Sequence, residues 1–157
     1  MISADTSFRT AITVAAPIER AFTVFTSGLD SWWPRAHHIA TVEMAEAVIE
    51  PRVDGRWFER GIDGSECEWG RVLAWDPPRH VGLSWHLNGA FNYDPDPAKA
   101  SRVDVRFLAE SDAITRVELE HSGLDRHGSD WIALREGISG PGGWPGLLAI
   151  FGETAGS

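Results

Sequence analysis

Residues 115–121 read Thr-Arg-Val-Glu-Leu-Glu-His, and this regular alternation of apolar and charged side chains decides the fold. Val117 and Leu119 fall on one side of an extended chain, while the charged side chains fall on the other. Residues 81–87 and 103–107 repeat the pattern. Alternation with a period of two is typical of antiparallel strands that have one buried face and one solvated face.

Four further segments are expected to be strands because they have a similar pattern and end at turn residues: 8–15, 41–50, 55–61 and 66–75. The last two flank Asp63-Gly64, a strong signal for a hairpin turn. The sequence therefore predicts seven antiparallel strands.

Helices are expected before and after this run of strands. Pro17 suits the first turn of a helix, and a stripe at i, i+3, i+4 and i+7 follows it, made by Ile18, Ala21, Phe22 and Phe25. We expect that helix to end at Gly28 and a second short one near residues 30–33. Another short helix is expected at 130–137.

The last helix is expected at residues 144–154 and carries a second apolar stripe, made by Trp144, Leu147, Leu148 and Phe151. A sheet with one apolar face and a helix with one apolar stripe bury these surfaces by packing together. We therefore predict an α+β fold in which a curved seven-stranded sheet wraps a long C-terminal helix. The 157 residues suit a single domain over 1–157, large enough to bury roughly 68–70% of its unfolded surface.

Charge and composition exclude several function classes. The net charge of −9 repels nucleic acid and anionic membrane surfaces. No apolar run approaches the roughly 18 residues of a membrane span, and the start of the chain lacks the pattern of a signal peptide. The single cysteine, Cys67, excludes an intramolecular disulfide and fits a reducing compartment. A cytoplasmic location is expected.

Eight tryptophans are more than the core of so small a domain requires. One interpretation is that several of them line a ligand pocket, since such pockets are rich in aromatic side chains. The alternative is that they pack on the outer face of the sheet.

Short motifs in a fixed order link this chain to a known family: Ala16-Pro17, Trp32-Trp33-Pro34, Gly55-Arg56-Trp57, Asp63-Gly64, Gly70-Arg71-Val72, Asp76-Pro77-Pro78, Leu83-Ser84-Trp85, Thr115-Arg116-Val117, His121 and Gly143-Trp144. With these motifs the chain resembles the START-like (SRPBCC) superfamily, and within it the family named after the activator of the 90-kDa heat-shock-protein ATPase. The resemblance covers nearly the whole chain. It implies a helix-grip fold with a deep cavity between sheet and helix. Relatives bind lipids, hormones or polyketides, act as cyclases, or serve as co-chaperones, and no catalytic signature accompanies the resemblance.

Polar residues that share the apolar face are the candidates for chemistry. His121 continues the series of Val117 and Leu119, and Trp57 shares a face with Glu59 if Arg56 and Arg60 point outward. Glu66 and Glu68 are expected inward if Arg71 points outward. An inward Glu beside His121 would form an acid/base pair with shifted pKa values. The alternative is that His121 hydrogen-bonds a tryptophan N–H, stays neutral and only orients the pocket.

The loop at 88–100 is expected to be mobile and to lie at the edge of the pocket, where Phe91 and Tyr93 could fold over a ligand. The predicted ligand-binding residues are Trp33, Trp57, Glu59, Glu68, Trp85, Phe91, Tyr93, His121, Trp144, Leu148 and Phe151.

No metal site and no cofactor are expected. His37-His38 and the pair His121 and His127 lack further ligands of the cysteine or aspartate type. There is no G-x-S-x-G motif, and the glycines at 137–143 lack the spacing of a dinucleotide loop, so we interpret them as a hinge. Acidic neighbours are expected to raise the pKa of Cys67 and leave it unreactive.

Three functions remain open. The leading hypothesis is binding of a small apolar or aromatic molecule in the cavity. The second is an enzyme of the cyclase, dehydratase or hydrolase type that uses Glu and His there. The third is an interaction module with a chaperone partner. The oligomeric state, a homodimer included, is not fixed by the sequence.

Overall fold

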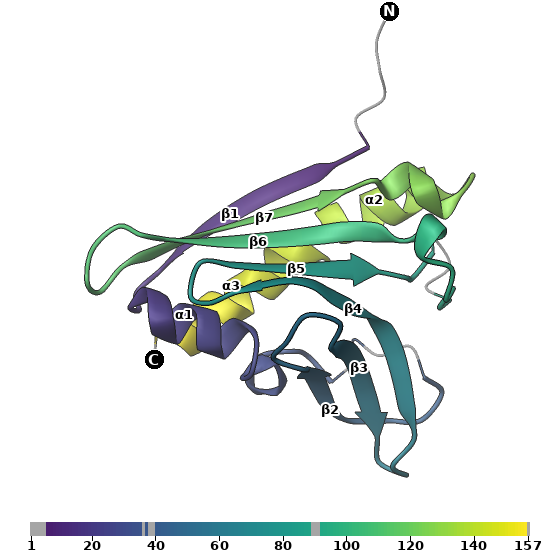
Figure 1. The fold of residues 1–157 in the computed structure, drawn as a ribbon, viewed down its shortest axis with the longest axis horizontal. Helices are drawn as coiled ribbons and strands as arrows, with labels where there is room; N and C mark the ends of the chain where they lie inside the picture. The colour runs from purple at the N-terminus through teal and green to yellow at the C-terminus, as the bar shows by residue number, and fades with distance from the viewer. Residues whose placement is uncertain (1–5, 36, 38–39, 89–91, 157) are drawn as a thin grey trace, which may run out of the picture.

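In the computed structural model, seven antiparallel strands form one curved sheet over the described residues 6–35, 37, 40–88 and 92–156 (Figure 1). The sheet has the strand order β1-β7-β6-β5-β4-β3-β2. In chain order the strands are β1 (Phe8–Val14), β2 (Met44–Ile49), β3 (Arg56–Gly61), β4 (Glu66–Asp76), β5 (His80–Trp85), β6 (Ser101–Ala109) and β7 (Thr115–Ser122).

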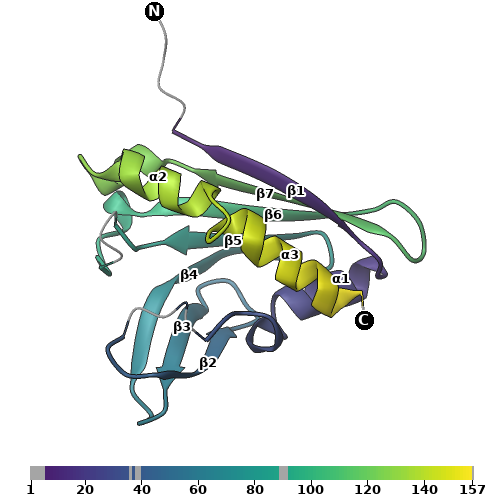
Figure 2. The same cartoon turned by 180° about the vertical axis from the view of Figure 1, so that it is seen from behind.

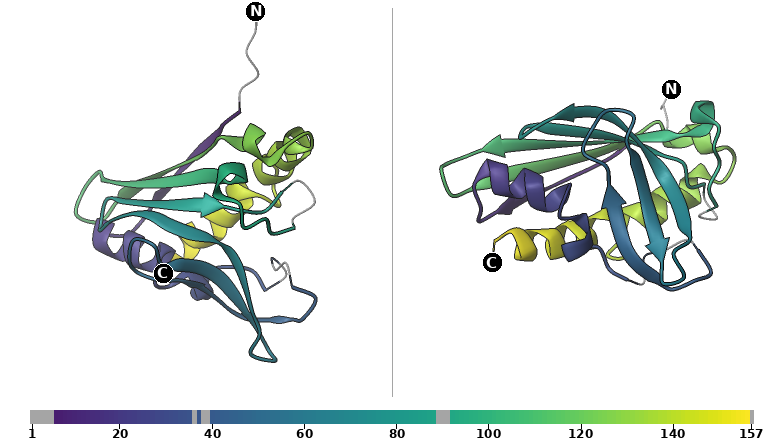
Figure 3. Two further views of the ribbon diagram at one scale, coloured as in Figure 1. Left: turned by 45° about the vertical axis from the view of Figure 1, so that its right-hand side comes forward. Right: turned by 60° about the horizontal axis from the view of Figure 1, so that its bottom comes forward.

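The α-helices gather on the concave side of this sheet. In chain order, the α-helices and the short 3₁₀ turns (η) are α1 (Ile18–Phe25), η1 (Leu29–Ser31), η2 (Pro97–Lys99), η3 (Leu124–His127), α2 (Trp131–Ser139) and α3 (Trp144–Ala155). Figure 2 shows α3 lying across the sheet with α1 beside its C-terminal end, and Figure 3 shows the sheet curving around α3. Arg20 of α1 fixes the two helices together because its Nε donates to the carbonyl of Ala155 at 2.7 Å. The predicted helix-grip architecture is confirmed.

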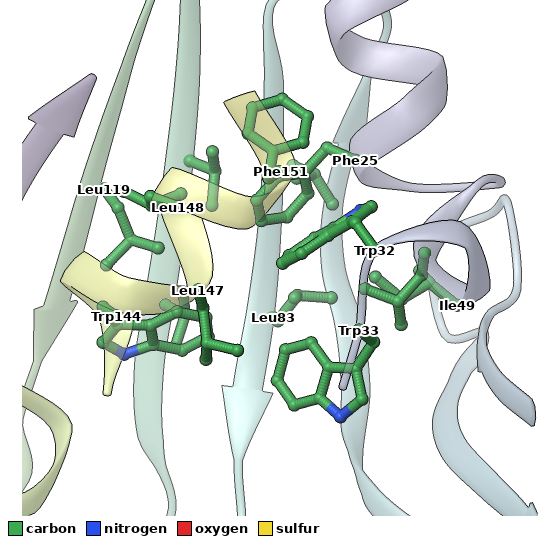
Figure 4. Packing of buried hydrophobic residues seen from close by; sticks show 14 of the residues in the cluster. Phe25, Trp32, Trp33, Ile49, Leu83, Leu119, Trp144, Leu147, Leu148 and Phe151 are labelled. Atoms are coloured by element: carbon green, nitrogen blue, oxygen red, sulfur yellow. The ribbon is translucent and has the colours of Figure 1, made fainter. Parts of the chain in front are cut away.

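The alternation in β7 produces the inward face that the sequence predicts. Thr115, Val117, Leu119 and His121 are each 1% exposed or less. β6 supplies matching inward residues because Val103 pairs with His121, and Val105 with Leu119. Together with the apolar stripe of α3, this face forms the core (Figure 4).

Some helices begin or end a few residues away from the predicted positions. The first helix ends at Phe25 rather than at Gly28, and Thr26 donates its hydroxyl to the carbonyl of Phe22. Pro17 precedes that helix as its N-cap residue. The second short helix is a 3₁₀ turn at 29–31, and Asp30 from this turn accepts the backbone N–H of Ala47 in the edge strand β2.

A β-bulge in β4 changes which residues face inward. Trp57 pairs with Gly70 but the next residue, Phe58, pairs with Glu68, so Trp69 is the extra residue. A bulge of this kind reverses the parity of the strand beyond it. Trp69 therefore points inward and Glu68 outward. The prediction that Glu68 faces inward with Val72 is wrong for this reason.

Gly70 is required at this bulge because the next strand lies very close to it. A Cβ placed there would lie 1.7 Å from the carbonyl oxygen of Ser84 on β5, far inside any real contact. The absence of a side chain lets β4 and β5 remain paired through the irregular stretch.

Candidate ligand-binding site

Five tryptophans and a histidine form a buried aromatic cluster between the sheet and the start of α3. Each is 5% exposed or less. The centroids of neighbouring rings lie 5.2 to 6.3 Å apart. The members of this aromatic cluster are Trp33, Trp57, Trp69, Trp85, Trp144 and His121. Four of the five tryptophans are predicted site residues, and Trp69 is the addition.

Sequence reasoning missed Trp69 because the bulge in β4 reverses its parity. Trp57 and Glu59 do share the inward face, as predicted, because Arg56 and Arg60 lie over the ring of Phe58 on the outer side.

Most indole N–H groups of the aromatic cluster already have acceptors, as expected for buried indoles. Four of them donate within the protein: Trp33 to the carbonyl of His37 at 2.9 Å, Trp69 to Oε1 of Glu59 at 2.9 Å, Trp85 to the carbonyl of Leu87 at 2.8 Å, and Trp144 to Nδ1 of His121 at 3.1 Å. Within the described part of the chain, the indole N–H of Trp57 has no hydrogen-bond acceptor. It is the donor that a ligand could use.

Glu59 is a buried carboxylate beside this cluster. Its side chain is 1% exposed, and Oε1 accepts the indole N–H of Trp69. Its Oε2 lies 3.4 Å from the backbone nitrogen of Ala40. N–H donors therefore compensate part of the cost of burying this acid.

His121 lies at the inner end of a chain of hydrogen bonds that leads to the surface. Because Nδ1 accepts from Trp144, the proton of the neutral ring is on Nε2, which lies 2.7 Å from Oγ of Ser101. The Ser101 hydroxyl then donates to Nε2 of His127, also at 2.7 Å. Each group in the chain therefore has a defined donor and acceptor role.

Burial, with a smaller contribution from the nearby His127, lowers the pKa of His121 to about 3. The ring is therefore neutral at physiological pH, which is the outcome expected for a tryptophan partner. The alternative of an acid/base pair between His121 and a glutamate is wrong. Both ring nitrogens are bonded to other groups, Glu59 is bonded to Trp69, and Glu68 lies on the other face.

Replacing Ser101 tests this chain of hydrogen bonds. Ser101→Ala leaves the buried Nε2–H of His121 without an acceptor, so we expect a loss of about 1–3 kcal/mol in the free energy of unfolding. Urea unfolding gives the value. Ser122→Ala, a half-buried serine at the end of the neighbouring strand, is the control, with an expected change below about 0.5 kcal/mol. Equal effects of the two substitutions would mean that the hydrogen bond contributes nothing.

The described part of the loop after β5, residues 92–100, folds over the outer face of the sheet rather than over the aromatic cluster. The Tyr93 hydroxyl donates to Oε2 of Glu68 at 3.0 Å, and its ring stacks on His86 with centroids 5.5 Å apart. The prediction that Tyr93 covers the pocket between sheet and helix is therefore wrong. The alternation of apolar and polar residues in the strands does not indicate how a loop between them folds. Phe91 lies outside the described residues.

A hollow of about 670 Å³ lies on this outer face. We call it the outer hollow. Ser84 and His86 are buried polar side chains in its lining, each 6% exposed. Sequence analysis did not single it out, although the alternation in residues 81–87 already placed these two side chains away from the core.

Leu148 and Phe151 face the sheet from α3, as predicted (Figure 4). Phe151 packs against Phe25 and Trp32, with ring centroids 5.2 and 5.4 Å apart. It therefore belongs to the core beside α1, and its ligand contact stays a prediction.

Other candidate chemistry finds little support in the geometry. Among the described residues, no three His, Cys, Asp or Glu side chains gather as metal ligands would. Burial, and secondarily the charge of Glu59, raises the pKa of the Cys67 thiol. No helix in the described part of the chain is long and apolar enough to span a membrane.

Comparison with known proteins agrees with the fold. The family model described as "Activator of Hsp90 ATPase homolog 1-like protein" matches residues 15–140. A solved structure of an anthrahydroquino-gamma-pyrone synthase, Txn09, complexed with SUM, is 39% identical, with 94% of this chain and 95% of that chain covered and a TM-score of 0.67. CalC, a self-sacrificing resistance protein from Micromonospora echinospora, is 31% identical, with 96% and 94% covered and a TM-score of 0.70.

A more distant structural neighbour is an HSP90 activator from Plasmodium falciparum, which is 19% identical with 74% of this chain and 72% of that chain covered. Its TM-score of 0.51 and low identity show a likeness of fold alone. The search of curated proteins gave no match.

Proposed function

Because this chain belongs to the family of Activator of Hsp90 ATPase homolog 1-like proteins, we propose that it binds a small apolar or aromatic molecule within the aromatic cluster between the sheet and α3. The observation that carries the proposal is the cluster itself, five tryptophans in mutual ring contact at a site where the core needs only ordinary apolar side chains. Flat aromatic faces are suited to a ligand ring, which replaces ring–ring contacts within the protein by contacts of the same kind.

The polarity of the cluster suggests which ligands fit. Its N–H groups are bonded to protein acceptors apart from that of Trp57, and His121 is neutral. A ligand with an apolar ring system and one carbonyl or ether oxygen would give the Trp57 N–H its acceptor. An anionic ligand would have to lose its hydration beside the acidic Glu59 and without a positive counter-ion in the cluster, and is disfavoured.

The relatives are consistent with this proposal. The synthase at 39% identity was determined in complex with SUM, and it covers nearly the whole of this chain. The similarity supports a ligand for this chain, and its location in the interior is inferred from the aromatic cluster.

A matched pair of probes tests the proposal. 2-Acetylnaphthalene carries a carbonyl, and 2-ethylnaphthalene has a similar shape without an acceptor. We expect both to shift the indole N–H resonances of the cluster in ¹H–¹⁵N spectra. The ketone should bind about 2–13 times more tightly, the factor that corresponds to one net hydrogen bond of about 0.5–1.5 kcal/mol.

Trp57→Phe keeps an aromatic ring and removes the N–H, so it should abolish the difference between the two probes. Trp75→Phe is the control, since the Trp75 ring packs against Phe22 outside the cluster. Unchanged indole resonances at saturating concentrations of both probes would refute binding at this site.

An enzyme acting in the same interior is the second candidate, and the buried carboxylate of Glu59 favours it. A general base beside a bound ketone would remove a proton from the methyl group next to the carbonyl, and the enolate would take up a deuteron from D₂O. Loss of the methyl signal of 2-acetylnaphthalene in D₂O, faster with the protein than with Glu59→Gln, would support this candidate. Equal rates of exchange with the two proteins would argue against catalysis by Glu59 and leave ligand binding as the proposed function.

A chaperone partner gains no support from the Plasmodium structure, because the likeness is confined to the fold.

A further inference from the structure

The outer hollow lies on the opposite side of the sheet from the aromatic cluster, and we propose that it binds a small organic carboxylate. The proposal does not depend on the interior site. The hollow is lined by residues of β4, β5 and β6, of the loop after β5 and of η3, and by Asp54 in the turn between β2 and β3.

Two arginines of the lining keep most of their donors available. Arg102 donates through Nε to Oδ2 of Asp104 at 2.8 Å, and Arg126 donates through Nε to the carbonyl of Ala98 at 3.2 Å. For both, the terminal Nη groups have no hydrogen-bond partner within the described part of the chain. Paired Nη groups match the two oxygens of a carboxylate, which is the geometry that distinguishes arginine from lysine.

The ion pairs around the hollow leave Arg126 as the lining arginine without a carboxylate partner among the described residues. Three arginines line the hollow, against the two carboxylates of Asp54 and Glu68. Arg71 is paired with Glu68 at 2.9 Å and Arg102 with Asp104 at 2.8 Å, so the charges within each pair largely offset each other. Recognition of an anion therefore falls first to Arg126, and the Nη donors of Arg102 are available as a second contact.

The rest of the lining suits an apolar body attached to the carboxylate. Leu73, Pro95, Pro97 and Ala100 contribute apolar surface. The volume of about 670 Å³ is within the usual range for small-molecule sites, roughly 300–1,000 Å³.

The base and wall of the hollow are held in place before any ligand arrives. Because the carbonyl of Asp94 can only accept, Nδ1 of His86 donates to it at 2.8 Å. The other ring nitrogen therefore accepts the hydroxyl of Ser84 at 2.9 Å, and this oxygen accepts the backbone N–H of Arg71 at 2.8 Å. These bonds fix the loop after β5 against β5, and a prearranged site loses less entropy on binding.

The experiment compares naphthalene-2-carboxylate with naphthalene-2-carboxamide, which has nearly the same shape and no charge. Titrations followed by ¹H–¹⁵N spectra should show the carboxylate shifting the amides of Ser84, Tyr93 and Ala100, while the indole resonances of the aromatic cluster stay in place. The carboxamide should bind at least about fivefold more weakly, because charge-assisted hydrogen bonds are about twice as strong as neutral ones.

Arg126→Gln should weaken carboxylate binding about fivefold and leave carboxamide binding unchanged, and adding Arg102→Gln should weaken it further. Arg116→Gln is the control, an exposed arginine paired with Glu118 outside this hollow. Arg126 is exposed, so its single variant tests the proposal even if the double variant does not fold. Equal affinities for the two probes, an unchanged affinity in Arg126→Gln, or shifts confined to the indoles would overturn it.

Discussion

Trp144→Ala is expected to lower the free energy of unfolding by about 3–5 kcal/mol, the usual cost of removing a large buried aromatic side chain. Trp144 is 2% exposed, lies at the first turn of α3, and contacts Trp33 and Trp85. Its removal leaves a cavity between helix and sheet. It also leaves Nδ1 of His121 without its donor.

Urea unfolding followed by far-ultraviolet circular dichroism gives this value. Trp144→Phe retains an aromatic ring in the core while removing the N–H, and it should cost less than the alanine variant. Ile150→Ala on the same helix is the control, since this side chain is 39% exposed and faces away from the sheet. A loss below about 1 kcal/mol for Trp144→Ala would show that the start of α3 does not pack on the sheet.

The second large effect is a loss of stability in acid that originates at His121. Burial lowers the pKa of His121 in the folded protein to about 3, whereas a histidine in the unfolded chain titrates near 6.5. Below pH 6.5 the unfolded chain binds a proton that the folded chain does not. The stabilisation is therefore complete above pH 6.5 and is lost as the pH falls toward 3, by an amount on the order of 5 kcal/mol.

Urea unfolding at intervals between pH 7.5 and 4 should show stability falling by up to about 1.4 kcal/mol per pH unit from this residue. His121→Asn should be less stable than the wild type at pH 7.5, and the gap should narrow toward pH 4. His127→Asn separates a second contribution, because burial also lowers the pKa of His127. A wild-type stability that is constant from pH 6.5 to 4 would contradict a buried, neutral His121.

The sequence predicted the fold because its local patterns agree with one another. Period-two alternation in residues 81–87 and 115–121 and the stripe of α3 define two apolar surfaces that fit each other. The same alternation correctly predicted that Trp57 and Glu59 share one face of their strand and that His121 is among the buried residues of β7. These inferences need only the geometry of a regular strand or helix, which local sequence specifies.

β4 is not a regular strand because it contains a β-bulge, and the prediction that Glu68 faces inward was wrong for this reason. One extra residue at the bulge turns Trp69 inward and Glu68 outward, and the requirement for Gly70 comes from the approach of Ser84 on another strand. No pattern within β4 itself reveals that approach.

Sequence alone determined the strand order along the chain, the apolar face of the sheet, the stripe of α3, and the inward placement of Trp57, Glu59 and His121. Only the tertiary structure decided that His121 is bonded to Trp144 and Ser101, that Trp69 joins the aromatic cluster, and that Tyr93 covers the outer face beside Arg126. The physical reason is separation along the chain. Periodicity records how a side chain is oriented relative to its near neighbours, whereas hydrogen-bond partners and hollows are formed by residues from distant elements whose meeting is settled by packing.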